Sequence, residues 1–78
     1  MSTILELSER VKAHAELPPP ATRRALRQAA GVSLADVADV VGVTRQAVSL
    51  WELGARTPRN TNLRAYVEIL RIFRESAR

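Results

Sequence analysis

The chain has 78 residues, 46% of them hydrophobic but only three aromatic, so it can build one small core and no second domain. It has no cysteine and a single histidine, which excludes a disulfide framework and a metal site built from thiolates or from several imidazoles of one chain. The net charge is +4, and the excess of arginine begins after residue 20, because residues 1–20 carry two basic and three acidic side chains.

The first predicted element is a helix over residues 3–16. Thr3 and Glu6 have the spacing of a capping box. Apolar residues recur every three to four positions and form one stripe: Ile4, Leu7, Val11 and Ala15. Three consecutive prolines end the helix. We therefore expect an N-terminal amphipathic helix with a proline-rich link over residues 1–20, and a main domain over residues 21–78.

In the main domain, a glycine follows each short helix. The first helix is expected over residues 21–30, directly before Gly31. The second begins at Ser33, which has capping-box spacing to Asp36, and ends at Gly42.

The second and third helices of this domain meet at a tight turn. Only Val43 separates the glycine from Thr44, which caps a third helix that ends at Gly54. A basic loop follows, and Asn60 or Thr61 caps a last helix. Two short helices joined by a glycine-containing turn are typical of a helix-turn-helix, although any small helical bundle can contain such a turn.

The outward face of the third helix favours a DNA-binding function. At about 100° per residue, Val48 and Trp51 share the inward face with Ala47. The other side presents Arg45, Gln46, Ser49 and Leu53, with Leu50 at the margin. A merely solvated helix usually carries Glu/Lys pairs, whereas arginine, glutamine and serine can hydrogen-bond to base edges in the major groove.

The stretch from Gly31 to Pro58, GVSLADVADVVGVTRQAVSLWELGARTP, resembles the phage repressor and Cro-like helix-turn-helix family, also called the XRE family. Its most specific part is the string Ser49-x-Trp51-Glu52-x-Gly54-x-Arg56-x-Pro58, and the resemblance covers about residues 21–73. It implies an all-α, compact, lambda-repressor-like bundle of four to five helices, here with an extra N-terminal helix. It also implies binding to operator DNA, usually as a two-fold dimer, regulation of transcription, and no catalysis.

The resemblance further implies roles for single residues. Base contacts are expected from Thr44, Arg45, Gln46, Ser49 and Leu50; for Leu50, partial burial is the alternative to packing on a thymine methyl. Phosphate contacts are expected from Arg27, Arg56, Arg59 and Asn60, and Arg27 also pairs with Glu52. Structural positions are Ser33, Gly42, Trp51 and Glu52. Many members carry glutamine where this chain has Leu34, so the phosphate contact of that glutamine is missing here.

The last helix is apolar on two sides, which predicts that it is buried on two sides. One side closes the core, and the other meets the N-terminal helix or another subunit. Because a two-fold DNA site calls for a symmetric protein, we expect a homodimer. Its expected interface residues are Tyr66, Ile69, Ile72 and Phe73.

Two functions fit these patterns. The first is a sequence-specific regulator that binds double-stranded DNA and represses transcription. The alternative is a protein-interaction module, such as an antitoxin or an adaptor, that holds its partner with residues 1–20. We expect no enzyme, cofactor, metal or small-molecule ligand, because no nucleophile, base and orienting group can be named. With no apolar run of membrane-spanning length and no signal-peptide pattern, a cytoplasmic location is expected.

Overall fold

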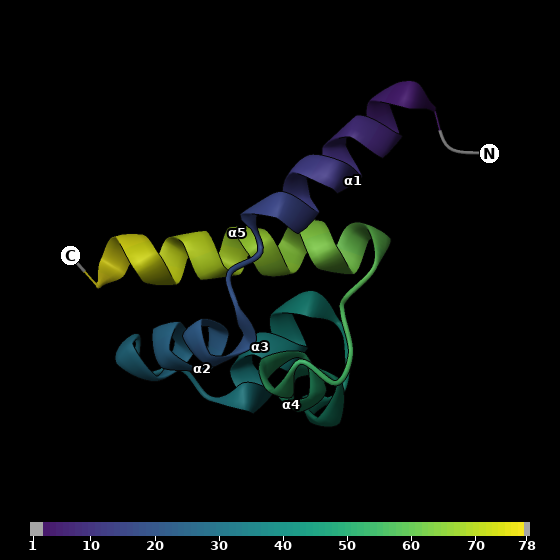
Figure 1. Cartoon of the computed structure of the whole chain (residues 1–78). Helices are drawn as coiled ribbons and strands as arrows, with labels where there is room; N and C mark the ends of the chain where they lie inside the picture. Colours follow the sequence, from purple (N-terminus) through teal and green to yellow (C-terminus); the bar gives the residue numbers. More distant parts are fainter. Residues whose placement is uncertain (1–2, 78) are drawn as a thin grey trace.

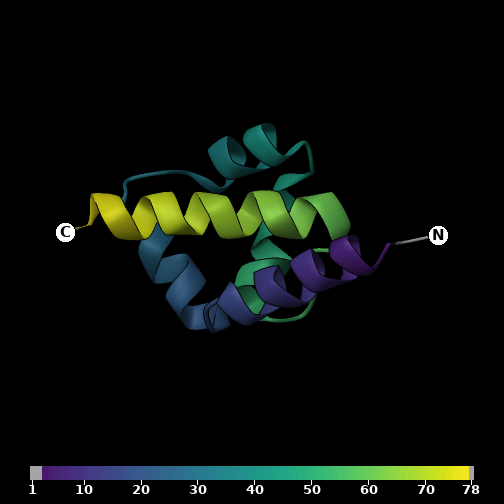
Figure 2. The same cartoon turned by 90° about the horizontal axis from the view of Figure 1, so that it is seen from above.

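The computed structural model describes residues 3–77, which fold into the helices α1 (Ile4–Glu16), α2 (Pro20–Ala29), α3 (Leu34–Val41), α4 (Arg45–Leu53) and α5 (Asn60–Ser76). Figure 1 shows α5 across the middle, with α1 on one side and α2, α3 and α4 on the other. Seen from above, α1 and α3 lie along opposite sides of α5 (Figure 2). The predicted helices and the all-α fold class are confirmed.

Side-chain caps begin three of the helices at the expected residues. The hydroxyl oxygen of Thr3 accepts a hydrogen bond from the backbone N–H of Glu6 at 3.1 Å. Ser33 and Asp36 form a complete capping box, with hydrogen bonds of 3.0 and 3.2 Å. Thr44 accepts from the backbone of α4 at 3.1 Å. Each cap satisfies an N–H group that the helix itself leaves unpaired.

The first turn of α5 differs from the prediction. Arg59 is the N-cap residue and makes no side-chain capping bond. Asn60 adopts a left-handed backbone conformation with φ of 53°, which asparagine tolerates better than most residues. The prediction that Asn60 or Thr61 caps this helix is therefore wrong.

The main core lies between α5 and the α3–α4 pair. Trp51 and Tyr66 are at its centre, with ring centroids 4.8 Å apart and planes tilted by 51°. This geometry is one that aromatic pairs prefer. The buried residues of this core are Val37, Ala38, Val48, Trp51, Tyr66, Leu70 and Phe73. The sequence-based placement of Trp51 in the core is confirmed.

Tyr66 and Phe73 lie in this core and do not form part of an outer face of α5. Only 1% of Tyr66 and 8% of Phe73 is exposed, whereas Ile72 is 54% exposed and Ile69 is half-buried. An aromatic ring already buried in its own chain has no surface left for another subunit. The predicted dimer surface of α5 is therefore corrected to Ile69 and Ile72.

α1 packs on α5 through the side opposite its apolar stripe. Ala13, the buried residue of α1, meets Leu63 and Val67 of α5. Two ion pairs flank this contact, one between Glu9 and Arg64 at 3.0 Å and one between Glu16 and Arg71. Both pairs join residues 55 positions apart, so the two helices run in the same direction.

The proline link is anchored to the end of α4 by a buried arginine. Arg23 donates from Nε to the carbonyl oxygen of Pro18 at 2.7 Å and from Nη1 to that of Trp51 at 2.8 Å. Only 8% of Arg23 is exposed, and this burial lowers the pKa of its guanidinium. The link therefore holds α2 and α4 in a fixed relation. Sequence reasoning did not single out Arg23.

Candidate nucleic-acid interface

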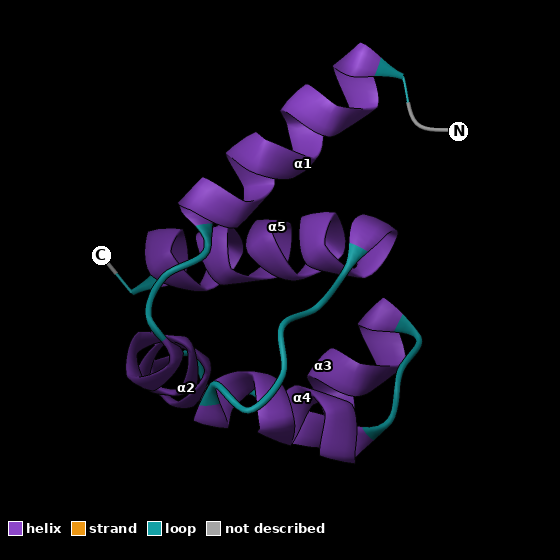
Figure 3. Cartoon of the chain, turned by 45° about the vertical axis from the view of Figure 1, so that its right-hand side comes forward, coloured by secondary structure: helices purple, strands orange, loops and turns teal. Residues whose placement is uncertain are grey.

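The turn between α3 and α4 brings the start of α4 to the surface. Gly42 has φ of 85°, a left-handed conformation that glycine adopts without steric cost. The N–H groups of Gly42 and Val43 both donate to the carbonyl oxygen of Ala38, at 2.8 and 3.0 Å. Figure 3 shows the resulting α3–α4 pair on the side of α5 away from α1.

α4 has a buried face and an outward face. Val48, Trp51 and Glu52 are buried, and they hold the helix on the domain. On the outward side, Thr44, Arg45 and Gln46 are exposed, and Ser49 and Leu50 are half-buried. The structure thus gathers the five predicted base-contact residues on one surface. Leu53, at the end of the same face, is 69% exposed.

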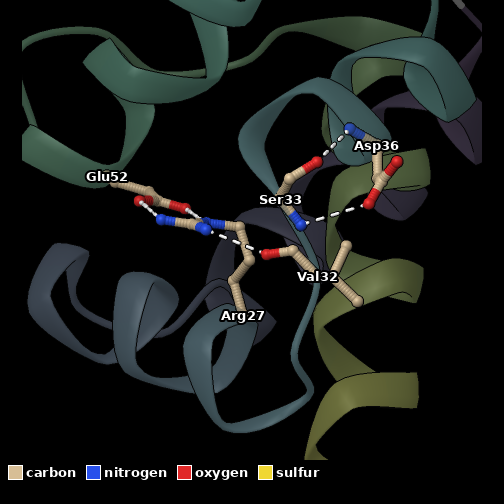
Figure 4. Close-up of polar contacts among 5 residues, drawn as sticks. All are labelled: Arg27, Val32, Ser33, Asp36 and Glu52. Carbon is tan, nitrogen blue, oxygen red and sulfur yellow. Dashed lines mark hydrogen bonds and ion pairs between the residues drawn. The ribbon is translucent and has the colours of Figure 1, made fainter.

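Arg27 and Glu52 form the polar joint between α2 and α4 (Figure 4). The guanidinium donates to both carboxylate oxygens, at 2.6 and 3.0 Å, and to the carbonyl oxygen of Val32 at 2.9 Å. The hydrogen bond to Glu52 raises the pKa of Arg27. The side chains are only 12% and 6% exposed. The predicted pairing is confirmed, and the contact of Arg27 with a phosphate stays a prediction.

Arg24 lies on one flank of the outward face. It lines a groove of ≈ 550 Å³ between α2, α3 and α4, together with Leu34, Ser49 and Leu53. Its side chain is exposed, and it forms no ion pair within residues 3–77. Sequence reasoning missed Arg24, although it precedes Arg27 by three residues and so had to share its side of α2.

The basic loop lies on the other flank of α4. Arg56 and Arg59 are exposed and line a groove with Val43 and Ala47. Asn60 lies farther along, in a groove between this loop and α1. The outward face of α4 therefore has free arginines on both sides, while Asn60 is displaced from it.

The surroundings of this surface are electropositive. Glu52 is the only acidic residue between positions 40 and 67, and its charge is taken up by Arg27. Positive charge without competing carboxylates is the electrostatic feature that polyanions such as DNA recognise. Among residues 3–77, no group of histidine and carboxylate side chains is arranged to hold a metal ion. In the same part of the chain, no helix has the length and apolar character to cross a membrane.

Comparison with known proteins identifies the family. A helix-turn-helix family model matches residues 24–72, which is more than half of the chain. No curated protein and no solved structure matches the chain significantly. The matched region contains the α3–α4 turn, the Arg27–Glu52 joint, the outward face of α4 and the basic loop. The chain therefore belongs to the XRE type of the helix-turn-helix family, whose members are DNA-binding regulators of transcription.

Proposed function

We propose that the protein is a repressor that recognises one sequence in double-stranded DNA and occupies it as a homodimer. The observation that carries this proposal is the surface of α4, where Arg45 and Gln46 stand exposed on the first turn. A recognition helix enters the major groove with this end. The operator sits on the chromosome, so the protein acts in the compartment that contains it.

Each exposed side chain of α4 has a chemical match on a base edge. Arg45 has the fork that donates two hydrogen bonds to guanine O6 and N7, and Gln46 can bind N6 and N7 of adenine. Thr44 and Ser49 can donate or accept, and Leu50 offers apolar contact to a thymine methyl group. These residues would carry the sequence preference.

The arginines beside α4 would bind the phosphate backbone. Arg24 on one flank, and Arg56 and Arg59 on the other, are exposed and can reach the strands that border a groove. Phosphate contacts fix register and orientation but read no sequence. The joint of Arg27 with Glu52 supports both functions, because it fixes the angle between α2 and α4.

A second copy would bind at the α3–α5 patch, which we define as Val40, Ile69 and Ile72. Val40 is 75% exposed, and these residues line an apolar groove of ≈ 290 Å³ together with Val32. Exposed apolar surface of this kind is a feature of protein interfaces. An isologous contact here would give the two-fold symmetry of a palindromic operator.

Selection of binding sites from a random duplex pool tests this function. We expect an inverted repeat whose half-sites are about 10 bp apart, one helical turn of DNA. Ile72→Glu should reduce the bound species to one chain per half-site, whereas Gln28→Glu, the same charge on an exposed position of α2, should not. A pool without any enriched sequence would contradict sequence-specific binding, and a single unrepeated site would contradict the symmetric dimer.

A further inference from the structure

α1 carries an unusual share of the apolar surface of the protein. Of seven large hydrophobic side chains that are exposed within residues 3–77, four belong to this helix: Ile4, Leu5, Leu7 and Val11. The first turns of α1 stand clear of α5 (Figure 3). A single exposed leucine needs no explanation, but a continuous stripe along one helix indicates an interaction surface.

The orientation of α1 is fixed by its contacts, so the stripe does not turn inward. Ala13 follows Ile4 by nine residues, about two and a half turns, and therefore lies on the opposite side of the helix. Rotating the helix to bury Ile4 would remove Ala13 from its place beside α5. It would also break the ion pairs of Glu9 and Glu16. The outward stripe is thus the arrangement that the charges of α1 and α5 select.

The charges beside the stripe are self-complementary. Glu6 and Arg10 lie one turn apart on the same edge, and neither forms an ion pair within residues 3–77. If two α1 helices lie antiparallel about an axis near Leu7 and Ser8, Glu6 faces the partner's Arg10, and Arg10 faces the partner's Glu6. The same axis sets Ile4 opposite the partner's Val11. Ser8, with its small side chain, allows the helices to approach closely where they cross.

We propose that α1 is a docking surface for a second copy of this chain, in an antiparallel helix pair related by a two-fold axis. The contact obeys the rule of isologous interfaces, in which residue i meets j and j meets i. It is separate from the α3–α5 patch and from the outward face of α4. A chain that uses both self-association surfaces joins two dimers into an assembly of four, so that two operators can be held by one assembly.

Sedimentation of the full chain in the Ile72→Glu background tests the α1 contact in isolation. We expect this variant to form dimers as its concentration rises, and Leu7→Glu added to it to leave monomers at every concentration tested. The stripe is exposed, so the charge at position 7 should leave the helical circular dichroism of the domain unchanged. A monomeric Ile72→Glu protein, or dimers that persist with Leu7→Glu, would overturn the proposal and assign the stripe to a different protein.

A charge swap in the same background tests the antiparallel register. Glu6→Arg alone and Arg10→Glu alone should each weaken the dimer at least tenfold, because like charges then face one another across the axis. The double variant should restore the dissociation constant to within about threefold. Lys12→Glu, on the other edge of the stripe, is the control and should have little effect. Additive losses in the double variant would contradict this register. Binding of Leu7→Glu to a single half-site should be unaffected, so a failure of the α1 contact is distinguishable from a failure of DNA binding.

Discussion

Arg45 and Arg59 lie in different parts of the candidate DNA surface, one on the first turn of α4 and one in the basic loop. We expect Arg45→Ala to lose about 1–3 kcal/mol of binding free energy on the selected operator and little on unrelated duplex. Arg59→Ala should weaken binding to both duplexes alike, because a phosphate contact carries no sequence information. Fluorescence anisotropy titrations with the two DNAs measure both effects. Equal losses on both duplexes for Arg45→Ala would contradict its assignment to a base.

Tyr66 couples stability to alkaline pH. Burial, helped by the nearby charge of Glu52, raises the pKa of this phenol from 10.0 to about 12. Its contribution to stability is complete below pH 10, where the hydroxyl is protonated in both states. Above pH 10 the unfolded chain ionises first, so about 2–3 kcal/mol should be lost as the pH rises to 12.

Urea unfolding at a series of pH values measures this loss, and Tyr66→Phe is the control. The hydroxyl of Tyr66 is buried and has no hydrogen-bond partner among the described residues, so removing it should leave the protein at least as stable at neutral pH. The chain has a single tyrosine, so phenolate absorbance reports this group alone. An unchanged alkaline loss in Tyr66→Phe would contradict the assignment.

The joint of Arg27 with Glu52 is the most consequential polar contact for stability. Glu52→Ala leaves a nearly buried guanidinium without its carboxylate, which should cost about 3–5 kcal/mol. A domain of this size has a total of about 4–12 kcal/mol, so the melting temperature should fall steeply. Thermal unfolding followed by circular dichroism checks this. The double variant Arg27→Met with Glu52→Leu should be more stable than Glu52→Ala; if it were not, the loss would come from packing and not from the unpaired charge.

At the scale of elements, the end of α4 is locked by the proline link. Gly54 has φ of 75°, and a Cβ there would lie 2.9 Å from Cγ of Pro20. Gly42 has φ of 85°, but a Cβ there would meet nothing within 4 Å. Alanine at either position should cost about 1–2 kcal/mol for the left-handed conformation. Gly54→Ala should cost roughly 1–3 kcal/mol more, because the proline ring must move.

Comparing the unfolding free energies of these two alanine variants isolates the contact. Both glycines end short helices in the same conformation, so their backbone strain is matched. A Gly54→Ala protein as stable as Gly42→Ala would show that the proline link yields freely.

What the sequence could predict depended on how local its cause was. Gly42 and Gly54 end their helices as expected, since a stop signal acts within one turn. Trp51 was placed correctly because it shares a face with Val48. Arg23 escaped notice because its partners are backbone carbonyls, which exist at every position and leave no mark in the sequence.

Ambiguity arose where a helix could present more than one face. α5 carries two apolar stripes, and only the packing shows that Tyr66 and Phe73 belong to the core while Ile72 stays outside. Periodicity identifies the apolar side of α1 but not the side that meets a neighbour. The matching sevenfold spacing of Glu9 and Glu16 with Arg64 and Arg71 was readable, yet pairing them required knowing that α1 lies along α5.

For the whole molecule, the arginines around α4 predict a steep dependence of DNA affinity on salt. If a dimer neutralises about six phosphates, log affinity should fall against log salt concentration with a slope of about −5. Arg24→Ala and Arg56→Ala should each make this slope shallower, since each removes one phosphate contact per chain. Titrations over a range of potassium chloride concentrations provide the values. A slope near zero would contradict an electrostatic interface.

The two buried hydrogen bonds of Arg23 also bear on the kinetics of recognition. α4 has nine residues, and a helix of that length is only marginally stable on its own in water. With its C-terminal carbonyl held by Arg23, α4 keeps its shape before any DNA arrives. The ordering entropy of this helix is therefore lost when the chain folds and not when it binds. Association then becomes a rigid docking step whose rate follows electrostatic attraction, unlike that of DNA-binding segments that fold on their target.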